Sequence, residues 1–215
     1  MIQQLSRFIS NLLSPLLMPT YGVIIALWVS ILCYQSLSTR LTVLFFIFGT
    51  TCLLPLLLLF AMQTAKMLPS KLVDHKERTL PYTCAIVCYL IATYYLTSVH
   101  APTWLTGFML GVATTTLVSL IINLKWKISA HAAGMGGIVA LLYFLHFIHM
   151  EAFNSLWILC LAIIMSGVVG SVRLYMQRHS LAQVLAGFAN GFLCVHILIK
   201  LFYWKIYKTS ILWNQ

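Results

Sequence analysis

The apolar stretch SLWILCLAIIMSGVVGSV, Ser155–Val172, contains no charged residue and leads directly into the polar segment RLYMQRHSLAQ, Arg173–Gln183. A helix needs about 20 mainly apolar residues to cross a bilayer, so the first stretch predicts a membrane span. Beyond Gln183, a further apolar run extends to about Tyr203. The polar segment is therefore expected to connect two membrane helices on one side of the bilayer.

The same alternation continues through the chain, which is 61% hydrophobic and only 7% charged. A soluble domain carries about 25% charged residues, and barrel strands would alternate rather than run continuously apolar. The sequence predicts an all-α, polytopic membrane helix bundle of six to seven transmembrane helices, with seven as the best count. The other five spans are expected at about Leu17–Tyr34, Leu41–Met62, Pro81–Val99, Trp104–Asn123 and Ala132–His149.

Two local features refine this expectation. Residues 1–16 are mildly amphipathic, which is typical of a segment lying at the membrane surface. Pro55 falls inside the second predicted span and is expected to kink it, because proline removes a helical N–H. No repeat, linker or polar domain interrupts the chain, so residues 1–215 are expected to form a single integral membrane domain.

The charge balance argues against metal chemistry. Thirteen Lys and Arg face only three acidic residues, Asp74, Glu77 and Glu151, which gives a net charge of +10. Metal-dependent hydrolysis needs clustered carboxylates, so we expect neither a metal nor another cofactor. His146 and His149 beside Glu151 are read as interfacial residues rather than a metal site. The six cysteines lie within apolar runs and are read as small buried hydrophobes.

Three polar segments carry residue types suited to phosphate. Arginine presents a planar fork of donors to phosphate oxygens, and histidine can attack phosphorus or carry a proton near neutral pH. Two spans separate each segment from the next, so all three are expected on the same side of the membrane. Their candidate residues are Lys71 and Arg78, then Ser129 and His131, then Arg173, His179 and Gln183.

In order, the segments read Lys71-x6-Arg78, Ser129-Ala-His131 and Arg173-x5-His179-x3-Gln183. This set resembles the type 2 phosphatidic acid phosphatase family, membrane lipid phosphatases related to vanadium haloperoxidases. Their motifs are Lys-x6-Arg-Pro, Pro-Ser-Gly-His and Ser-Arg-x5-His-x3-Asp.

The resemblance implies a metal-independent phosphatase that hydrolyses a lipid phosphomonoester or pyrophosphate. His179 would attack phosphorus to form a phosphohistidine, and His131 would protonate the leaving alkoxide. The phosphate would be bound by Lys71, Arg78, Ser129 and Arg173. Gln183 would orient the attacking ring of His179.

Departures from the family motifs keep other readings open. Gln183 stands where the family has aspartate, and a neutral amide orients imidazole without stabilising its cation. Ile128 and Ala130 replace proline and glycine, Val172 replaces serine, and Pro81 comes two places late. The alternative is an impaired homologue that binds or transports a phosphorylated lipid without hydrolysing it. A third reading takes the basic residues as ordinary flanks of membrane spans.

The expected partners are the bilayer and a phosphorylated lipid, not nucleic acid. With seven spans the motif side carries nine Lys and Arg and the other side four. That excess favours a cytoplasmic site, although it includes the residues expected to bind phosphate. The family resemblance implies an outward-facing site. We expect a bacterial cell membrane protein whose site faces the periplasm or exterior.

Overall fold

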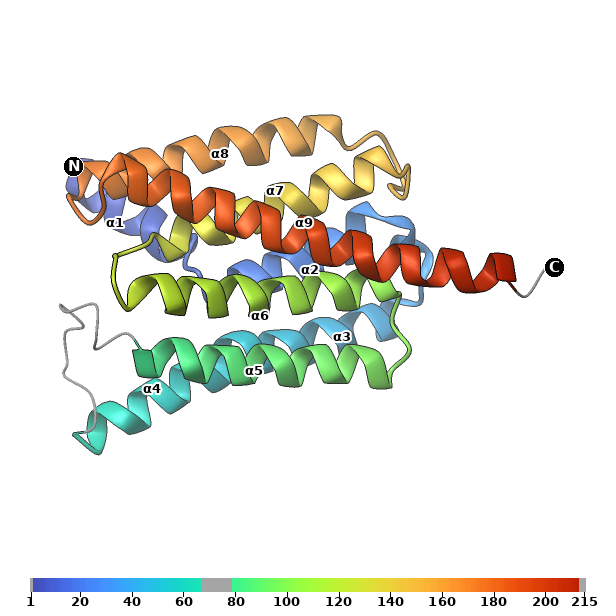
Figure 1. Cartoon of the computed structure of the whole chain (residues 1–215), viewed down its shortest axis with the longest axis horizontal. Coiled ribbons are helices and arrows are strands. Elements are labelled where there is room, and N and C mark those ends of the chain that lie inside the picture. Colours follow the sequence, from blue (N-terminus) through green and yellow to red (C-terminus); the bar gives the residue numbers. More distant parts are fainter. Residues whose placement is uncertain (1, 67–78, 213–215) are drawn as a thin grey trace.

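The structure, a computed structural model, describes residues 2–66 and 79–212, with side chains for 3–66 and 79–204. The described chain is almost entirely helical and its helices lie side by side in one bundle (Figure 1). The helices are α1 (Ile2–Leu12), α2 (Met18–Val29), α3 (Leu37–Phe48), α4 (Leu54–Thr64), α5 (Thr79–Ser98), α6 (Thr103–Asn123), α7 (Ala130–Phe147), α8 (Leu156–Tyr175) and α9 (Leu181–Leu212), with a 3-10 turn at Ile31–Tyr34 and a π turn at Gly49–Leu53.

Six helical segments of the described chain are long and apolar enough to cross a membrane. They confirm the predicted all-α membrane bundle. The first predicted span is instead a 12-residue apolar helix, α2, followed by the 3-10 turn. It ends at Val29 because the Ser30 hydroxyl donates to the carbonyl of Ala26 and accepts from the N–H of Leu32.

Helix α7 forms the centre of the bundle, with 67% of its spanning window buried against other helices. Close approach of α7 to α9 depends on glycine. A Cβ at Gly136 would collide with the carbonyl of Phe188, and one at Gly191 would collide with the carbonyl of Ala133. Small residues at such contacts let membrane helices pack closely. The α7–α9 contact therefore fixes how the two polar ends of these helices meet.

The second span departs from α-helical geometry directly before Pro55, the residue at which a kink was expected. Proline supplies no N–H, and the helix directly before it widens into the π turn Gly49–Leu53, with Leu54 N–H donating to the Gly49 carbonyl. Within this turn the buried Thr51 hydroxyl lies 3.2 Å from the Thr20 hydroxyl of α2. The wider turn thus gains a polar contact inside the bundle.

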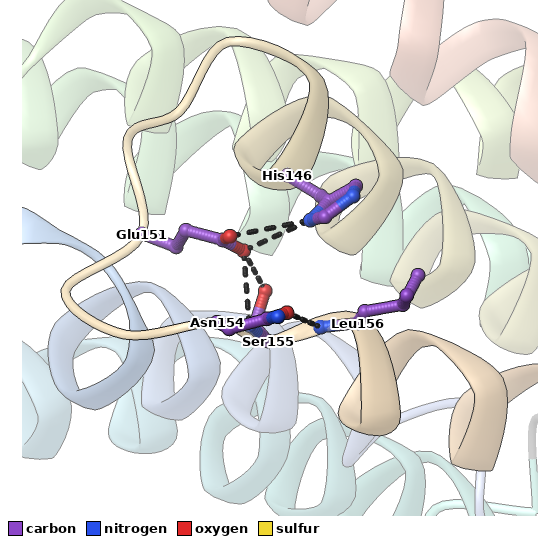
Figure 2. A network of polar contacts seen from close by, with 5 residues as sticks. All are labelled: His146, Glu151, Asn154, Ser155 and Leu156. Atoms are coloured by element: carbon purple, nitrogen blue, oxygen red, sulfur yellow. Dashed lines mark hydrogen bonds and ion pairs between the residues drawn. The ribbon is translucent and has the colours of Figure 1, made fainter.

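At the end away from the motifs, Glu151 links the end of α7 to the start of α8 (Figure 2). Its carboxylate lies 3.2 Å from His146 Nδ1 and accepts from both the N–H and the hydroxyl of Ser155 at the start of α8. Burial alone would raise the pKa of Glu151, but the hydrogen bonds from Ser155 and His146 hold it below its usual value. The backbone on either side of Glu151 is hydrogen-bonded to the end of α2 and the residues after it. Ile31 N–H donates to the Met150 carbonyl and Ala152 N–H donates to the Val29 carbonyl, both at 2.9 Å.

Among the described residues, no three His, Cys, Asp or Glu side chains come together as a group able to hold a metal ion. All six cysteines are free thiols.

Candidate active site

His179 and Gln183 lie at the turn between α8 and α9. His179 Nδ1 is 3.2 Å from Gln183 Oε1, and His179 is 91% buried. An amide oxygen only accepts, so this contact places the ring proton on Nδ1 and the lone pair on Nε2. The geometry therefore supplies the tautomer that a nucleophilic histidine requires.

Gln183 also caps α9. Its Oε1 accepts from the Ser180 N–H at 3.2 Å, while Ser180 Oγ accepts from the Gln183 N–H at 3.4 Å. This reciprocal pair is a capping box, and its Ser-x-x-Gln signature is visible in the sequence. Sequence reasoning assigned Gln183 to the histidine alone and missed this second role. One side chain thus fixes both the helix start and the imidazole.

Arg173 and His131 meet at the N-terminal helix α1, the surface segment expected at residues 1–16. Arg173 Nη1 donates to Ser10 Oγ at 3.0 Å. His131 Nε2 lies 3.1 Å from the Ser10 carbonyl oxygen and 3.3 Å from Ser10 Oγ. Because a carbonyl only accepts, the shorter contact requires a proton on His131 Nε2. Ser10 was not foreseen, since an amphipathic helix gives no signal of where its polar face will dock.

Ser129 begins α7 rather than lining a site. Its side chain is fully buried, and its Oγ accepts from the Ala132 N–H at 3.4 Å as an N-terminal cap. Its backbone N–H donates to the Gln183 carbonyl at 3.3 Å. Ser129 therefore holds the start of α7 against the first turn of α9, and so sets the spacing between His131 and His179.

Three of the predicted residues line one cavity of about 390 Å³: His131, Arg173 and His179. Lys71 and Arg78 lie outside the described residues. The number of membrane crossings predicted that the three polar segments lie on the same side of the membrane. For the second and third segments the structure confirms this. The rest of the cavity is mainly apolar and reaches deep into the bundle. Its walls include Met18, Leu59, Ala85, Phe108, Ile138 and Val195.

The cavity has the shape of a lipid site with a charged end. His131 and Ile138 both line it, and seven residues of helix separate them, so it extends about 10 Å along α7. A fixed guanidinium and two imidazoles at one end suit an anion, while apolar walls below suit a hydrocarbon tail. In this arrangement His179 carries its lone pair on Nε2 and His131 carries a proton on Nε2.

No model of a known protein family, no curated protein and no solved structure matches the chain. The functional assignment is therefore carried by the geometry of this site.

Proposed function

We propose that the chain is a metal-independent membrane lipid phosphatase of the type 2 phosphatidic acid phosphatase kind. The observation that carries the proposal is the grouping of Arg173, His131 and His179 at the polar end of an apolar cavity within a membrane bundle. A water-soluble phosphate ester would not need the deep apolar wall, and an uncharged lipid would not need the cation.

In the proposed reaction, His179 Nε2 attacks phosphorus while its Nδ1–H is held by Gln183 Oε1. Arg173 stabilises the charge that develops on the phosphate oxygens. The bond from phosphorus to the lipid oxygen breaks. His131, which enters the step as the imidazolium, gives that oxygen its Nε2 proton and becomes neutral. Water then attacks the phosphohistidine, its proton passes to His131, and inorganic phosphate leaves.

His131 must change partner during this reaction. In the structure its Nε2 proton points to the Ser10 carbonyl, 3.1 Å away. Substrate would have to bring its leaving oxygen into that position. Lys71 and Arg78, from the segment outside the described residues, complete the proposed phosphate site.

The second candidate function is binding or transport of a phosphorylated lipid without turnover, and Gln183 favours it. Attack by His179 creates an imidazolium that a carboxylate would stabilise and an amide does not. In a serine protease triad, replacing the orienting aspartate by its amide lowers turnover by about 10⁴-fold. The phosphate site and the cavity would be retained in this case.

The test is phosphate release from a panel of lipid substrates in detergent with a chelator present. The panel contains phosphatidic acid, phosphatidylglycerol phosphate, a polyprenyl pyrophosphate and a phosphorylated lipid A. We expect release from at least one lipid, abolished by His179→Gln. His149→Asn is the matched control, because His149 is exposed, lies at the opposite end and has a positive φ of 54° that asparagine tolerates. Saturable lipid binding without release would favour the second function instead.

The proposal places the site on the outer or periplasmic side of a bacterial cell membrane. This orientation is tested with a cysteine introduced at Lys125, an exposed residue on the side of the site. The cysteine should react with a membrane-impermeant thiol reagent added to intact cells. A cytoplasmic site would leave that cysteine unmodified.

A further inference from the structure

Three consecutive threonines on α6 differ in how their hydroxyls are used. Thr114 donates to the Leu110 carbonyl and Thr116 to the Val112 carbonyl, both at 2.9 Å. This bond to the preceding turn is how a hydroxyl is normally satisfied inside a membrane helix. The Thr115 hydroxyl, between them, has no oxygen or nitrogen hydrogen-bond partner among the described residues, although Thr115 is 93% buried. Burying an unsatisfied hydroxyl costs free energy. Thr115 lines the cavity, so a ligand bound there can supply the acceptor.

The hydrogen bonds of Asn190, on α9, determine which neighbouring hydroxyl groups can still donate a hydrogen bond to a ligand. Its Nδ2 donates to the Thr115 carbonyl and to Ser119 Oγ, both at 3.0 Å. Ser119 therefore already accepts a hydrogen bond, which leaves its own O–H to donate. The Cys194 sulfur is the polar atom within hydrogen-bonding reach of the Thr115 hydroxyl. Sulfur is a weak acceptor, and the thiol itself donates to Asn190 Oδ1 at 3.3 Å. Two hydroxyl donors are thus left, Thr115 and Ser119.

Both hydroxyl residues line the cavity that ends at Arg173 and His179. Ser119 lies one turn from Asn123, where α6 ends beside the site, and Thr115 lies one turn deeper. These positions are about 6 Å and 12 Å from the end of the helix. Phe108, at the apolar end, is about 16 Å beyond Ser119 along α6. The donors therefore stand between the phosphate end and the hydrocarbon end.

We propose that Thr115 and Ser119 form a second polar subsite that binds an ester carbonyl oxygen of an acyl lipid phosphate. The inference rests on the proposed lipid-phosphate function and narrows its substrate class. Acyl esters place carbonyl acceptors between the phosphate and the hydrocarbon chain, where these donors lie. A polyprenyl phosphate or pyrophosphate has no acceptor beyond its phosphates, so it would leave both hydroxyls unsatisfied.

The test compares a diacyl glycerol phosphate with its dialkyl ether analogue of equal chain length, and with farnesyl phosphate. The ether keeps the phosphate and the tails and lacks only the carbonyl oxygens. For the wild type we expect kcat/KM on the diacyl lipid to exceed that on the ether by about three- to tenfold, the contribution of one or two ordinary hydrogen bonds. This arm requires no variant to fold.

The variants Thr115→Val and Ser119→Ala should lower the diacyl rate toward the ether rate and leave the ether rate unchanged. Thr114→Val is the matched control, because Thr114 is bonded within its own helix and does not line the cavity. It should keep the wild-type preference. Equal rates for diacyl and ether lipids, or equal losses on both lipids in Thr115→Val, would overturn the subsite and leave the phosphatase proposal intact.

Binding of the same three lipids, measured by thermal stabilisation, separates the two proposals when no phosphate is released. Tighter binding of the diacyl lipid than of the ether, reduced in Thr115→Val, upholds the subsite although hydrolysis fails. Failure to bind any of the three lipids overturns both.

Discussion

His179 and Gln183 are joined by a contact of 3.2 Å between Nδ1 and Oε1, and the same Oε1 accepts from the first N–H of the α9 capping box. Orientation of the imidazole is thereby tied to the start of a membrane helix. An aspartate at this position has a shorter side chain and reaches both groups less well. Glutamate has the same length as glutamine and also forms capping boxes.

We therefore expect Gln183→Glu to raise turnover more than Gln183→Asp does. The carboxylate would stabilise the imidazolium formed as His179 attacks, while the helix cap is kept. A gain of about tenfold corresponds to about 1.4 kcal/mol of barrier. The measurement is kcat on the best lipid across pH, with Gln183→Met as the variant that removes both contacts. An unchanged rate and pH profile in Gln183→Glu would show that Gln183 does not orient the attacking ring.

Oxyanions that mimic pentacoordinate phosphorus should bind at Arg173 and His179. Vanadate or tungstate should raise the melting temperature of the purified protein. Each tenfold gain in affinity for the anion corresponds to about 1.4 kcal/mol of binding free energy. Arg173→Ala and His179→Ala should each abolish that rise. Lys125→Ala serves as the control, since it removes an exposed cation on the same side of the bundle. Stabilisation that survives in both site variants would place the anion elsewhere.

The helix arrangement was readable from the sequence because hydrophobic length alone determines which segments can span a bilayer. The span expected at Trp104–Asn123 is the helix Thr103–Asn123. The span expected at Leu17–Tyr34 breaks at Ser30, whose hydroxyl competes for backbone groups. That competition depends on a single side chain, which hydrophobic averaging does not detect.

Part of the site was also readable. The parity of membrane crossings predicted that His131 and Arg173 lie on the same side of the membrane, without any knowledge of packing. Ser10 could not be found this way, because α1 does not span the membrane and its docking is decided by tertiary contacts. Likewise, the role of Ser129 as a helix cap follows from its burial, which depends on tertiary packing. The Ser180–Gln183 capping box, in contrast, has a local signature that was present in the sequence.

Protonation of Glu151 should weaken the bundle at the end opposite the site. Its pKa is held below the unfolded value of about 4.3, so the carboxylate stabilises the fold above that pH. The contribution is lost as pH falls through the lower, folded pKa. Glu151→Gln should reduce the melting temperature at neutral pH by about 2–4 °C, the shift expected for about 1 kcal/mol. The difference between the variant and the wild type should shrink on acidification. A constant difference at all pH values would contradict this role.

Ser10 should compete with substrate for Arg173. Its hydroxyl accepts from Arg173 Nη1 at 3.0 Å, a position that a phosphate oxygen would take. Helix α1 is held there because the Tyr21 hydroxyl donates to the Leu12 carbonyl at 2.9 Å. Ser10→Ala removes the hydroxyl acceptor and leaves the backbone carbonyl that contacts His131. In this variant the Arg173 guanidinium loses no hydrogen bond to Ser10 Oγ when an anion binds.

Vanadate should bind Ser10→Ala about three- to tenfold more tightly than the wild type, the effect of one hydrogen bond no longer displaced. The dissociation constant is read from a titration of melting temperature. Asn11→Ala is the matched control, because Asn11 is the exposed neighbour of Ser10 on the same helix. Weaker binding in Ser10→Ala would give the opposite assignment, in which the hydroxyl positions Arg173 for the anion rather than competing with it.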